Sequence, residues 1–411
     1  MAVQRAALHG MLLLAVAASG AAAAKVPAVY VFGDSTADVG NNDYLPWSIA
    51  RADFPHNGVD FPGGRPTGRF SNGLIGADFL AIAMGFSGSP PPYLSLMAAT
   101  AANSSRSSSE VTRNTTMAAA AAYMSGANFA SAGSGLLDST GSTINMTQQI
   151  GYFSDLKDQM SNRLSAGKVA DSLSKSIFLI SAGSNDAFDF FSQNRSPDST
   201  AIQQFSEAMI STYDSHVKTL YHLGARKFAV INVPLIGCCP YLRSQNPTGE
   251  CVERLNQIAK SLNDGIKDLF SNLSSEMQGM KYSIGSAYQL VSSLIQSPHA
   301  AGKLQQPSRS ILDTKPRMPV ISHLFLRYIC RFAHFLPAGL EEVKSACCGG
   351  GRFNAEIGCT PISSCCSDRS KYLFWDLLHP TQATSKFAGL AFYNGPAQFV
   401  SPISIKQLVE A

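Results

Sequence analysis

The sequence has few charged residues, and those present are not concentrated. Only 15% of the 411 residues are charged, the formal net charge is +4, and 45% are hydrophobic. Lysines and arginines are scattered, with no polybasic run and no interleaved aromatic residues. Nucleic-acid binding needs a basic face of that kind, so we expect a solvated surface and no nucleic-acid partner. The length allows one large domain or two small ones.

The N-terminus lacks an apolar run long enough to cross a bilayer. Residues 11–18 are apolar, but a spanning helix needs about 20 such residues. Arg5 precedes this run, and small residues follow it at 19–24. That order predicts a secretory signal peptide over residues 1–24 and a secreted, extracellular protein without a transmembrane span. A buried N-terminal helix is the alternative.

The cysteines lack the C-x-x-C spacing of a zinc site. In an exported protein their clustering predicts disulfide bonds that lock loops, whereas a zinc site would need a reducing compartment. Six of the nine fall after residue 329, in a stretch rich in glycine and proline; the full set is Cys238, Cys239, Cys251, Cys330, Cys347, Cys348, Cys359, Cys365 and Cys366.

An exported chain would also present acceptor sites for glycans. The sequence predicts that some of its Asn-x-Ser/Thr sequons are glycosylated surface loops. Asn194 is the weakest of them, because a proline follows its serine. The five sequons lie at Asn103, Asn114, Asn145, Asn194 and Asn272.

Short apolar runs alternate with longer amphipathic segments along the chain. The runs predict buried strands at residues 28–32, 176–181, 227–233 and, less clearly, 281–284. Helical patterns lie between them, at residues 145–163, 201–223 and 251–273. Strands separated by helices of this length predict an α/β fold, with a mostly parallel sheet in a three-layer α/β/α arrangement. We expect a single domain over residues 25–411.

Two segments do not fit this plan. Residues 98–122 are a low-complexity run of serine, threonine and alanine, which predicts a disordered or glycosylated loop. Residues 303–338 are basic and include an apolar stretch interrupted by arginines, which argue against a membrane span. We interpret this second segment as an insertion without a function of its own, an amphipathic surface helix being the alternative.

Ser35 occupies a position suited to a nucleophile. The stretch VFGDSTADVGNND, residues 31–43, begins inside the first predicted strand and places Ser35 directly after it. Open parallel sheets bind ligands at the carboxyl ends of their strands. A serine hydroxyl needs a base, a group that orients the base, and donors for the oxyanion that forms. The Gly-x-Ser-x-Gly elbow of α/β-hydrolases is absent, and taken alone a Gly-Asp-Ser stretch is a common turn.

Asp376 and His379 form the clearest candidate for the base and its partner. They lie three residues apart, so the carboxylate can reach the imidazole Nδ1 and leave Nε2 free to face a hydroxyl. The alternative is a surface turn with a capping aspartate. Among the other histidines after the predicted signal peptide, His56 alone also has an acid three residues before it, Asp53; the rest are His216, His222, His299, His323 and His334.

Two further residues could supply oxyanion donors, since each follows an apparent strand. Gly133 can offer its backbone N–H without steric hindrance, and Asn185 can offer its side-chain amide. Each could instead be an ordinary turn residue. Ser35, Gly133 and Asn185 together nevertheless predict one reactive edge of one sheet.

These stretches resemble the four signature blocks of the GDSL-type (SGNH) hydrolases. The blocks are GDS at 33–35, NFASAG at 128–133, GSND at 183–186 and DLLH at 376–379. Their extended forms, VFGDSTADVGNNDYLP, GANFASAGSGLLDST, INVPLIGCCP and FWDLLHPTQ, are similar to the plant branch, and the resemblance covers residues 26–400. It implies a flavodoxin-like fold with a five-stranded parallel sheet.

The resemblance also implies roles for the candidate residues. Ser35 would be the nucleophile, His379 the base and Asp376 its orienting partner. The oxyanion hole would combine the Ser35 N–H, the Gly133 N–H and the Asn185 side chain. Against the family pattern, residues 303–338 look like an insertion whose removal would leave eight cysteines, which suggests a retained intron.

The sequence therefore predicts a secreted serine esterase or lipase that cleaves small-molecule or lipid esters through an acyl-enzyme, with no metal or cofactor. An acyltransferase that uses the same acyl-enzyme is one alternative, and a catalytically inactive wall-associated binding protein is another. The acyl chain, the alcohol and the oligomeric state have no readable signal in the sequence.

Overall fold

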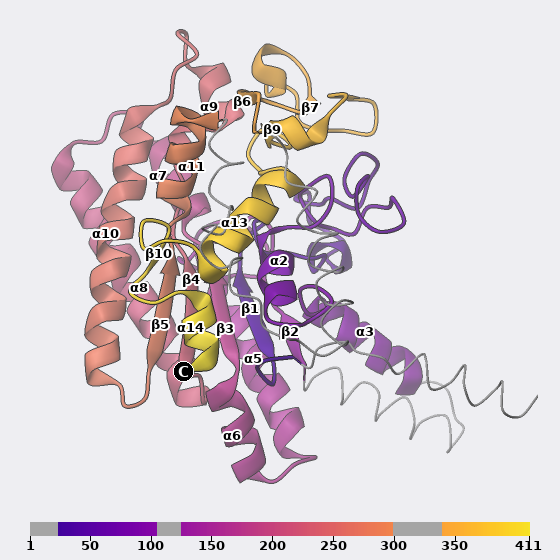
Figure 1. Ribbon diagram of the computed structural model, residues 1–411, viewed down its shortest axis with the longest axis vertical. Coiled ribbons are helices and arrows are strands. Elements are labelled where there is room, and N and C mark those ends of the chain that lie inside the picture. The colour runs from indigo at the N-terminus through magenta and orange to yellow at the C-terminus, as the bar shows by residue number, and fades with distance from the viewer. Residues whose placement is uncertain (1–23, 105–124, 299–338) are drawn as a thin grey trace, which may run out of the picture.

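A six-stranded sheet runs through the middle of the molecule (Figure 1). The computed structural model describes residues 24–104, 125–298 and 339–411. Strands β1 to β5 are parallel, and β10 pairs with β5 in the antiparallel direction. From edge to edge the strands are β2 (Gly126–Asn128), β1 (Val29–Gly33), β3 (Ile177–Ser181), β4 (Lys227–Ile231), β5 (Lys281–Gly285) and β10 (Val400–Ser401).

The apolar runs form the central strands, as the sequence predicts. β1 is buried along its whole length, and β3 and β4 are buried over all but their ends. A parallel strand covered by helices on both faces has no polar side, which explains why these runs are continuous rather than alternating. The predicted α/β fold is confirmed. The predicted five-stranded parallel sheet needs one addition, the two-residue β10, which is too short to carry a pattern.

Helices cover both faces of this sheet. In Figure 1, α2, α13 and α14 lie in front of it, while α5, α8 and α10 pack together behind it. The three predicted helices are present as α5, α8 and α10, so those predictions are confirmed. The helices are α2 (Gly76–Ala83), α3 (Tyr93–Ser104), α5 (Met146–Ser161), α6 (Ala166–Lys175), α7 (Ser184–Gln193), α8 (Ser199–Leu223), α9 (Pro240–Gln245), α10 (Glu253–Glu276), α11 (Ala287–Gln296), α13 (Gln382–Asn394) and α14 (Ile405–Glu410).

The strand order puts the end of β1 at a special place. The chain leaves β1 to form β2 on one side and later returns to form β3 on the other. Such a switch point is where open parallel sheets bind ligands, because the connections there diverge. Gly33 ends β1 with φ 143°, and a Cβ at this position would overlap the carbonyl oxygen of Ser181 in β3. Only glycine lets the two strands stay this close just before the chain turns.

The cysteine-rich segment forms a small substructure apart from the main sheet. β6 (Glu342–Ala346) pairs with β9 (Tyr372–Phe374), and β7 (Cys348–Gly349) pairs with β8 (Ser364–Cys365). Within the described residues Cys239 and Cys365 form no disulfide. The prediction of loop-locking disulfides is confirmed for three pairs, which are Cys238–Cys251, Cys347–Cys366 and Cys348–Cys359.

The segments that did not fit the sequence pattern are described only in part. The predicted loop at 98–122 is wrong over residues 98–104, which continue α3, because alanine-rich sequence favours helix. Residues 105–122, the segment 303–338 and nearly all of the signal peptide predicted at 1–24 lie outside the described residues. In the part of the chain that is described, every helix is too short or too polar to cross a membrane.

Candidate active site

Ser35 lies in a tight turn at the carboxyl end of β1. The turn closes through bonds from the backbone N–H groups of Ala37 and Asp38 to the carbonyl oxygen of Asp34. The Asp34 carboxylate accepts hydrogen bonds from the backbone N–H and the hydroxyl of Thr36, at 2.9 and 2.7 Å. Asp34 and Asp38 are buried, while Ser35 itself stays partly accessible. The polar residues after β1 therefore fix a turn that leaves one hydroxyl available.

Asp376 and His379 lie in a second tight turn, between β9 and α13. Trp375 donates its backbone N–H to the carbonyl oxygen of His379 at 2.8 Å, which closes this turn. The Asp376 carboxylate accepts the backbone N–H groups of Leu378 and His379, at 2.9 and 2.8 Å. The indole of Trp375 is fully buried and donates to the Asn57 side chain at 2.9 Å. These bonds hold the turn against the body of the protein.

The two turns bring three predicted site residues into one hydrogen-bonded chain. His379 Nε2 lies 2.8 Å from Ser35 Oγ, and His379 Nδ1 lies 2.9 and 2.8 Å from the two carboxylate oxygens of Asp376. An ionised carboxylate only accepts, so the proton of a neutral imidazole sits on Nδ1 and Nε2 can accept from the serine hydroxyl. The Phe70 ring packs on the imidazole with its centroid 4.8 Å away.

Burial and charge act in opposite directions on this pair. Burial alone would lower the pKa of His379, but the adjacent Asp376 carboxylate and, further away, Asp34 raise it above the ordinary value. Burial alone would raise the pKa of Asp376, but His379 and two backbone N–H groups hold that pKa below its usual range. The site thus stabilises an imidazolium next to a carboxylate, which is the state that proton transfer from Ser35 would create.

Gly133 and Asn185 lie on the two segments that flank β1 at the same sheet edge. Gly133 has φ 86° in the turn after β2, and Asn185 lies in the first turn of α7, directly after β3. The Asn185 amide donates to the carbonyl oxygen of Ser134 at 2.8 Å, so the two candidate donors belong to linked segments. One amide hydrogen makes that bond, and the second hydrogen on the same nitrogen remains for another acceptor.

Gln149 is the residue that sequence reasoning missed. It is fully buried on α5 and binds the backbone of Gly33 twice, accepting from its N–H and donating to its carbonyl oxygen, both at 2.9 Å. Its amide also donates to Ser134 Oγ at 3.2 Å and to the Ile144 carbonyl oxygen at 2.9 Å. Gln149 therefore joins the Ser35 turn to the Gly133 segment. The available signal was a polar residue within the buried stripe of α5.

Asp186 and the pair Asn41 and Asn42 complete this framework. Asp186 is buried and accepts from the backbone N–H groups of Leu136 and Leu137, at 2.8 and 2.9 Å. Asn41 donates to the carbonyl oxygen of Ala130, and Asn42 to that of Ala132. These side chains explain why polar residues follow Ser35 in the sequence. They replace the sheet hydrogen bonds that stop where β1 and β2 end.

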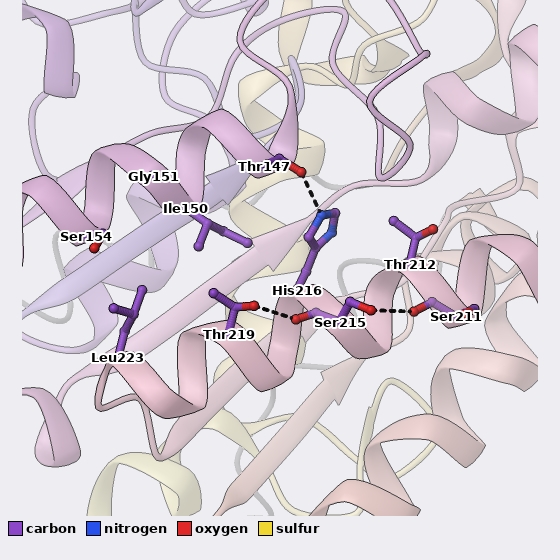
Figure 2. A pocket seen from close by; sticks show the side chains of 10 residues that line it. All are labelled: Thr147, Ile150, Gly151, Ser154, Ser211, Thr212, Ser215, His216, Thr219 and Leu223. Atoms are coloured by element: carbon purple, nitrogen blue, oxygen red, sulfur yellow. Dashed lines mark hydrogen bonds between the residues drawn. The ribbon is translucent and has the colours of Figure 1, made fainter.

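A separate groove of about 580 Å³ lies between α5 and α8 (Figure 2). Its walls carry serine and threonine hydroxyls, and none of the five predicted site residues lines it. His216 lines this groove with Nε2 3.3 Å from Thr147 Oγ1, while its buried Nδ1 has no partner. Burial lowers the pKa of His216. This histidine therefore lies at the contact between the two helices, α5 and α8.

Within residues 24–104, 125–298 and 339–411, one cluster has the residue types of a metal site, namely Cys238, Cys251 and Glu253. The two cysteines are joined in a disulfide, so their sulfurs are not thiolate ligands. This cluster therefore does not fit a metal ion.

Comparison with known proteins places this arrangement in context. The sequence profile of the family described as "GDSL-like Lipase/Acylhydrolase" matches residues 29–392. The chain is 34% identical over 393 residues to a GDSL esterase/lipase of Arabidopsis thaliana, a match that covers 94% of this chain and 90% of that protein. A second Arabidopsis thaliana GDSL esterase/lipase is 31% identical over 398 residues, covering 93% of this chain and 91% of that protein.

Replacing Gln149 by leucine tests its structural role. The change removes the acceptor of the buried Gly33 N–H, so we expect the free energy of unfolding in urea to fall by about 2–3 kcal/mol. The matched control is Gln203→Leu, because Gln203 is exposed on α8 and its side chain donates to the exposed Glu207 side chain. Its effect should stay within ~0.5 kcal/mol. Equal losses in the two variants would mean that the Gln149 bonds do not hold the turn.

Proposed function

Because this chain belongs to the GDSL-like lipase/acylhydrolase family, we propose that it hydrolyses carboxylic esters through an acyl-enzyme on Ser35. The resemblance inferred from the sequence motifs is confirmed, and so is the assignment to the carboxylic ester hydrolases. The catalytic roles rest on one observation above all, the hydrogen-bonded chain from Asp376 through His379 to Ser35 Oγ. Such a chain turns a weak hydroxyl nucleophile into a reactive one.

The first half of the reaction acylates Ser35. His379 Nε2 takes the hydroxyl proton as Oγ attacks the ester carbonyl carbon, and the carbonyl oxygen becomes an oxyanion. The C–O bond to the alcohol then breaks, and the leaving oxygen takes the proton back from Nε2. Asp376 keeps the imidazole in the required tautomer and stabilises its positive charge while the proton is held.

The oxyanion would be held by three donors at the sheet edge. These are the backbone N–H groups of Ser35 and Gly133 and the second amide hydrogen of Asn185. Fixed donors of this kind stabilise the charge only where it develops, which is why they accelerate the reaction rather than tighten substrate binding. The links through Gln149 and Ser134 support this role, because they fix the distance between the contributing segments.

The second half of the reaction replaces the alcohol by water. His379 deprotonates a water molecule, which attacks the acyl carbon and releases the carboxylic acid and Ser35. An alcohol that reaches the acyl-enzyme before water would make the same site an acyltransferase. We propose hydrolysis as the primary reaction because the two similar Arabidopsis thaliana proteins are named GDSL esterase/lipases. We further propose that the protein acts outside the cell, because the apolar run that follows Arg5 has the pattern of a secretory signal peptide.

Substitution of Ser35 by alanine tests the proposal. The wild-type enzyme should hydrolyse p-nitrophenyl esters and become labelled at residue 35 by a fluorophosphonate probe, and mass spectrometry of the digested protein locates the label. Ser35→Ala should lose the label and at least about 10³-fold in kcat, since no nucleophile remains. A variant that keeps full hydrolysis would exclude the acyl-enzyme on Ser35. A wild-type protein without label or turnover would favour the inactive binding protein.

The pH dependence of kcat/KM tests the base. General-base catalysis needs neutral imidazole, and the pKa of His379 is raised above its ordinary 6.5. As the pH falls through this raised pKa, His379 becomes protonated and activity is lost, so the acid limb should have its midpoint above 6.5. Asp376→Asn removes the nearest negative charge, which should move the midpoint to lower pH and reduce kcat sharply.

The control for this profile is His216→Gln, a buried histidine outside the site. It should leave the acid limb of kcat/KM where it is in the wild type. A midpoint that moves with His216 and stays unchanged in Asp376→Asn would rule out His379 as the titrating base.

A further inference from the structure

Two large apolar side chains project into solvent next to the proposed oxyanion hole. Trp47 is 69% exposed and Ile49 is fully exposed, and both belong to the segment 44–49, which we call the Trp47 loop. No residue between Tyr44 and Ala50 is charged. Large apolar groups pointing outward from one uncharged loop are unusual on a protein in water, and they commonly mark a contact surface.

The Trp47 loop is fixed to the catalytic edge. Asn42, which is buried, donates one amide to the carbonyl oxygens of both Ala50 and Ala132, at 2.8 and 2.9 Å. It also lies 3.2 Å from the hydroxyl of Ser48, inside the loop. A Cβ built on Gly133 would contact Ala50 at 3.9 Å. The loop that carries Trp47 and Ile49 is thus held in place by the same residue that holds the Gly133 segment.

A second exposed apolar group lies on the His379 side of the site. Ile357 and Ile362 are 61% and 96% exposed. Between them, Gly358 lies against Leu377, the residue that follows Asp376. Arg369, which follows Ile362 in the chain, binds the Asp60 carboxylate in a two-point ion pair, at 2.6 and 2.8 Å. Asp60 belongs to the segment that follows the Trp47 loop in the sequence. Exposed apolar side chains therefore lie on segments that contact the Gly133 turn and the turn of Asp376 and His379.

We propose that the Trp47 loop docks on the surface of aggregated lipid, so that the enzyme takes its ester substrate from a micelle or membrane surface. This inference deepens the proposed function and rests on it for the identity of the substrate. A protein partner is disfavoured because it would cover the reactive edge, whereas a lipid surface delivers the acyl ester to it. Trp47 suits this contact because its indole has an apolar body and one N–H for the polar interface. Since the loop carries no charge, neutral lipid should suffice and salt should have little effect.

The chain contains its own reporter for this contact. It has two tryptophans, Trp47 and Trp375. Trp375 is fully buried, so quenching of tryptophan fluorescence by acrylamide reports mainly on Trp47. The probe is a vesicle of phosphatidylcholine, and the protein carries Ser35→Ala so that no lipid is cleaved during the measurement. Vesicles should shift the emission to shorter wavelength and reduce quenching several-fold, equally in low and high salt.

Two matched variants in the same background locate the contact while keeping both tryptophans. Ile49→Ser removes a fully exposed apolar side chain from the Trp47 loop, and vesicle partitioning should weaken roughly tenfold. Leu390→Ser removes an exposed leucine from α13, well beyond the helix start near His379, and partitioning should stay the same. With Ser35 restored, Ile49→Ser should lower the ratio of turnover on emulsified long-chain ester to turnover on soluble short-chain ester.

The outcomes separate the two proposals. Unchanged quenching of Trp47 in the presence of vesicles would overturn the docking surface, as would equal partitioning of Ile49→Ser and Leu390→Ser. An active enzyme that ignores vesicles would leave the ester hydrolysis standing and remove only the surface. Vesicle binding without any esterase activity in the Ser35 protein would support the surface and overturn the proposed hydrolysis.

Discussion

The hydrogen bond between His379 Nε2 and Ser35 Oγ is the contact on which the rest of the site depends. It joins two residues 344 positions apart in the chain, across 2.8 Å. Each residue lies in a short turn, and neither turn on its own would indicate a reactive side chain. The turn of Ser35 forms where β1 ends. The turn of His379 is held by the backbone N–H of Trp375, which donates to the His379 carbonyl oxygen, and by the His379 N–H, which donates to the Asp376 carboxylate. In the proposed mechanism, the fold contributes to catalysis by fixing these two turns relative to one another.

Buried carboxylates order the loops at the sheet edge that carries Ser35, where the sheet hydrogen bonds end. Asp34, Asp38, Asp186 and Asp376 are all buried, and each accepts backbone N–H groups from a loop. Burial raises the pKa of Asp34 and of Asp38 to about 6, against a partial lowering by those hydrogen bonds. A carboxyl group with a raised pKa favours the folded state less as the pH rises through that value. At neutral pH the ionised, buried carboxylates of Asp34 and Asp38 therefore lower the free energy of unfolding.

Only Asp376 among these four has its pKa lowered, because it alone faces a histidine in direct contact. In the proposed mechanism, environment rather than residue type thus distinguishes the reactive carboxylate, Asp376, from the three that order the loops. Asp34 orders its own loop, and its charge also raises the pKa of His379, by less than the charge of Asp376 does.

The sequence predicted the parts of this protein that carry strong patterns. The continuous apolar runs located β1, β3 and β4, and strand-end logic predicted that Ser35, Gly133 and Asn185 would lie on one edge. The spacing of Asp376 and His379 predicted their contact. The sequence could not predict β10, because two residues carry no periodicity, or Gln149, because its role depends on contacts with Gly33 far away in the chain. The sequence likewise does not show that Trp47 and Ile49 are exposed, because their exposure depends on how the chain folds around them.

The most direct test of the central claim is a crystal structure of the enzyme inhibited by a long-chain phosphonate. We expect phosphorus bound to Ser35 Oγ, His379 Nε2 within hydrogen-bonding distance of that oxygen, and the phosphoryl oxygen about 3 Å from the Gly133 N–H and the Asn185 amide. A phosphoryl oxygen that points away from both Gly133 and Asn185, or an adduct on another residue, would contradict the account.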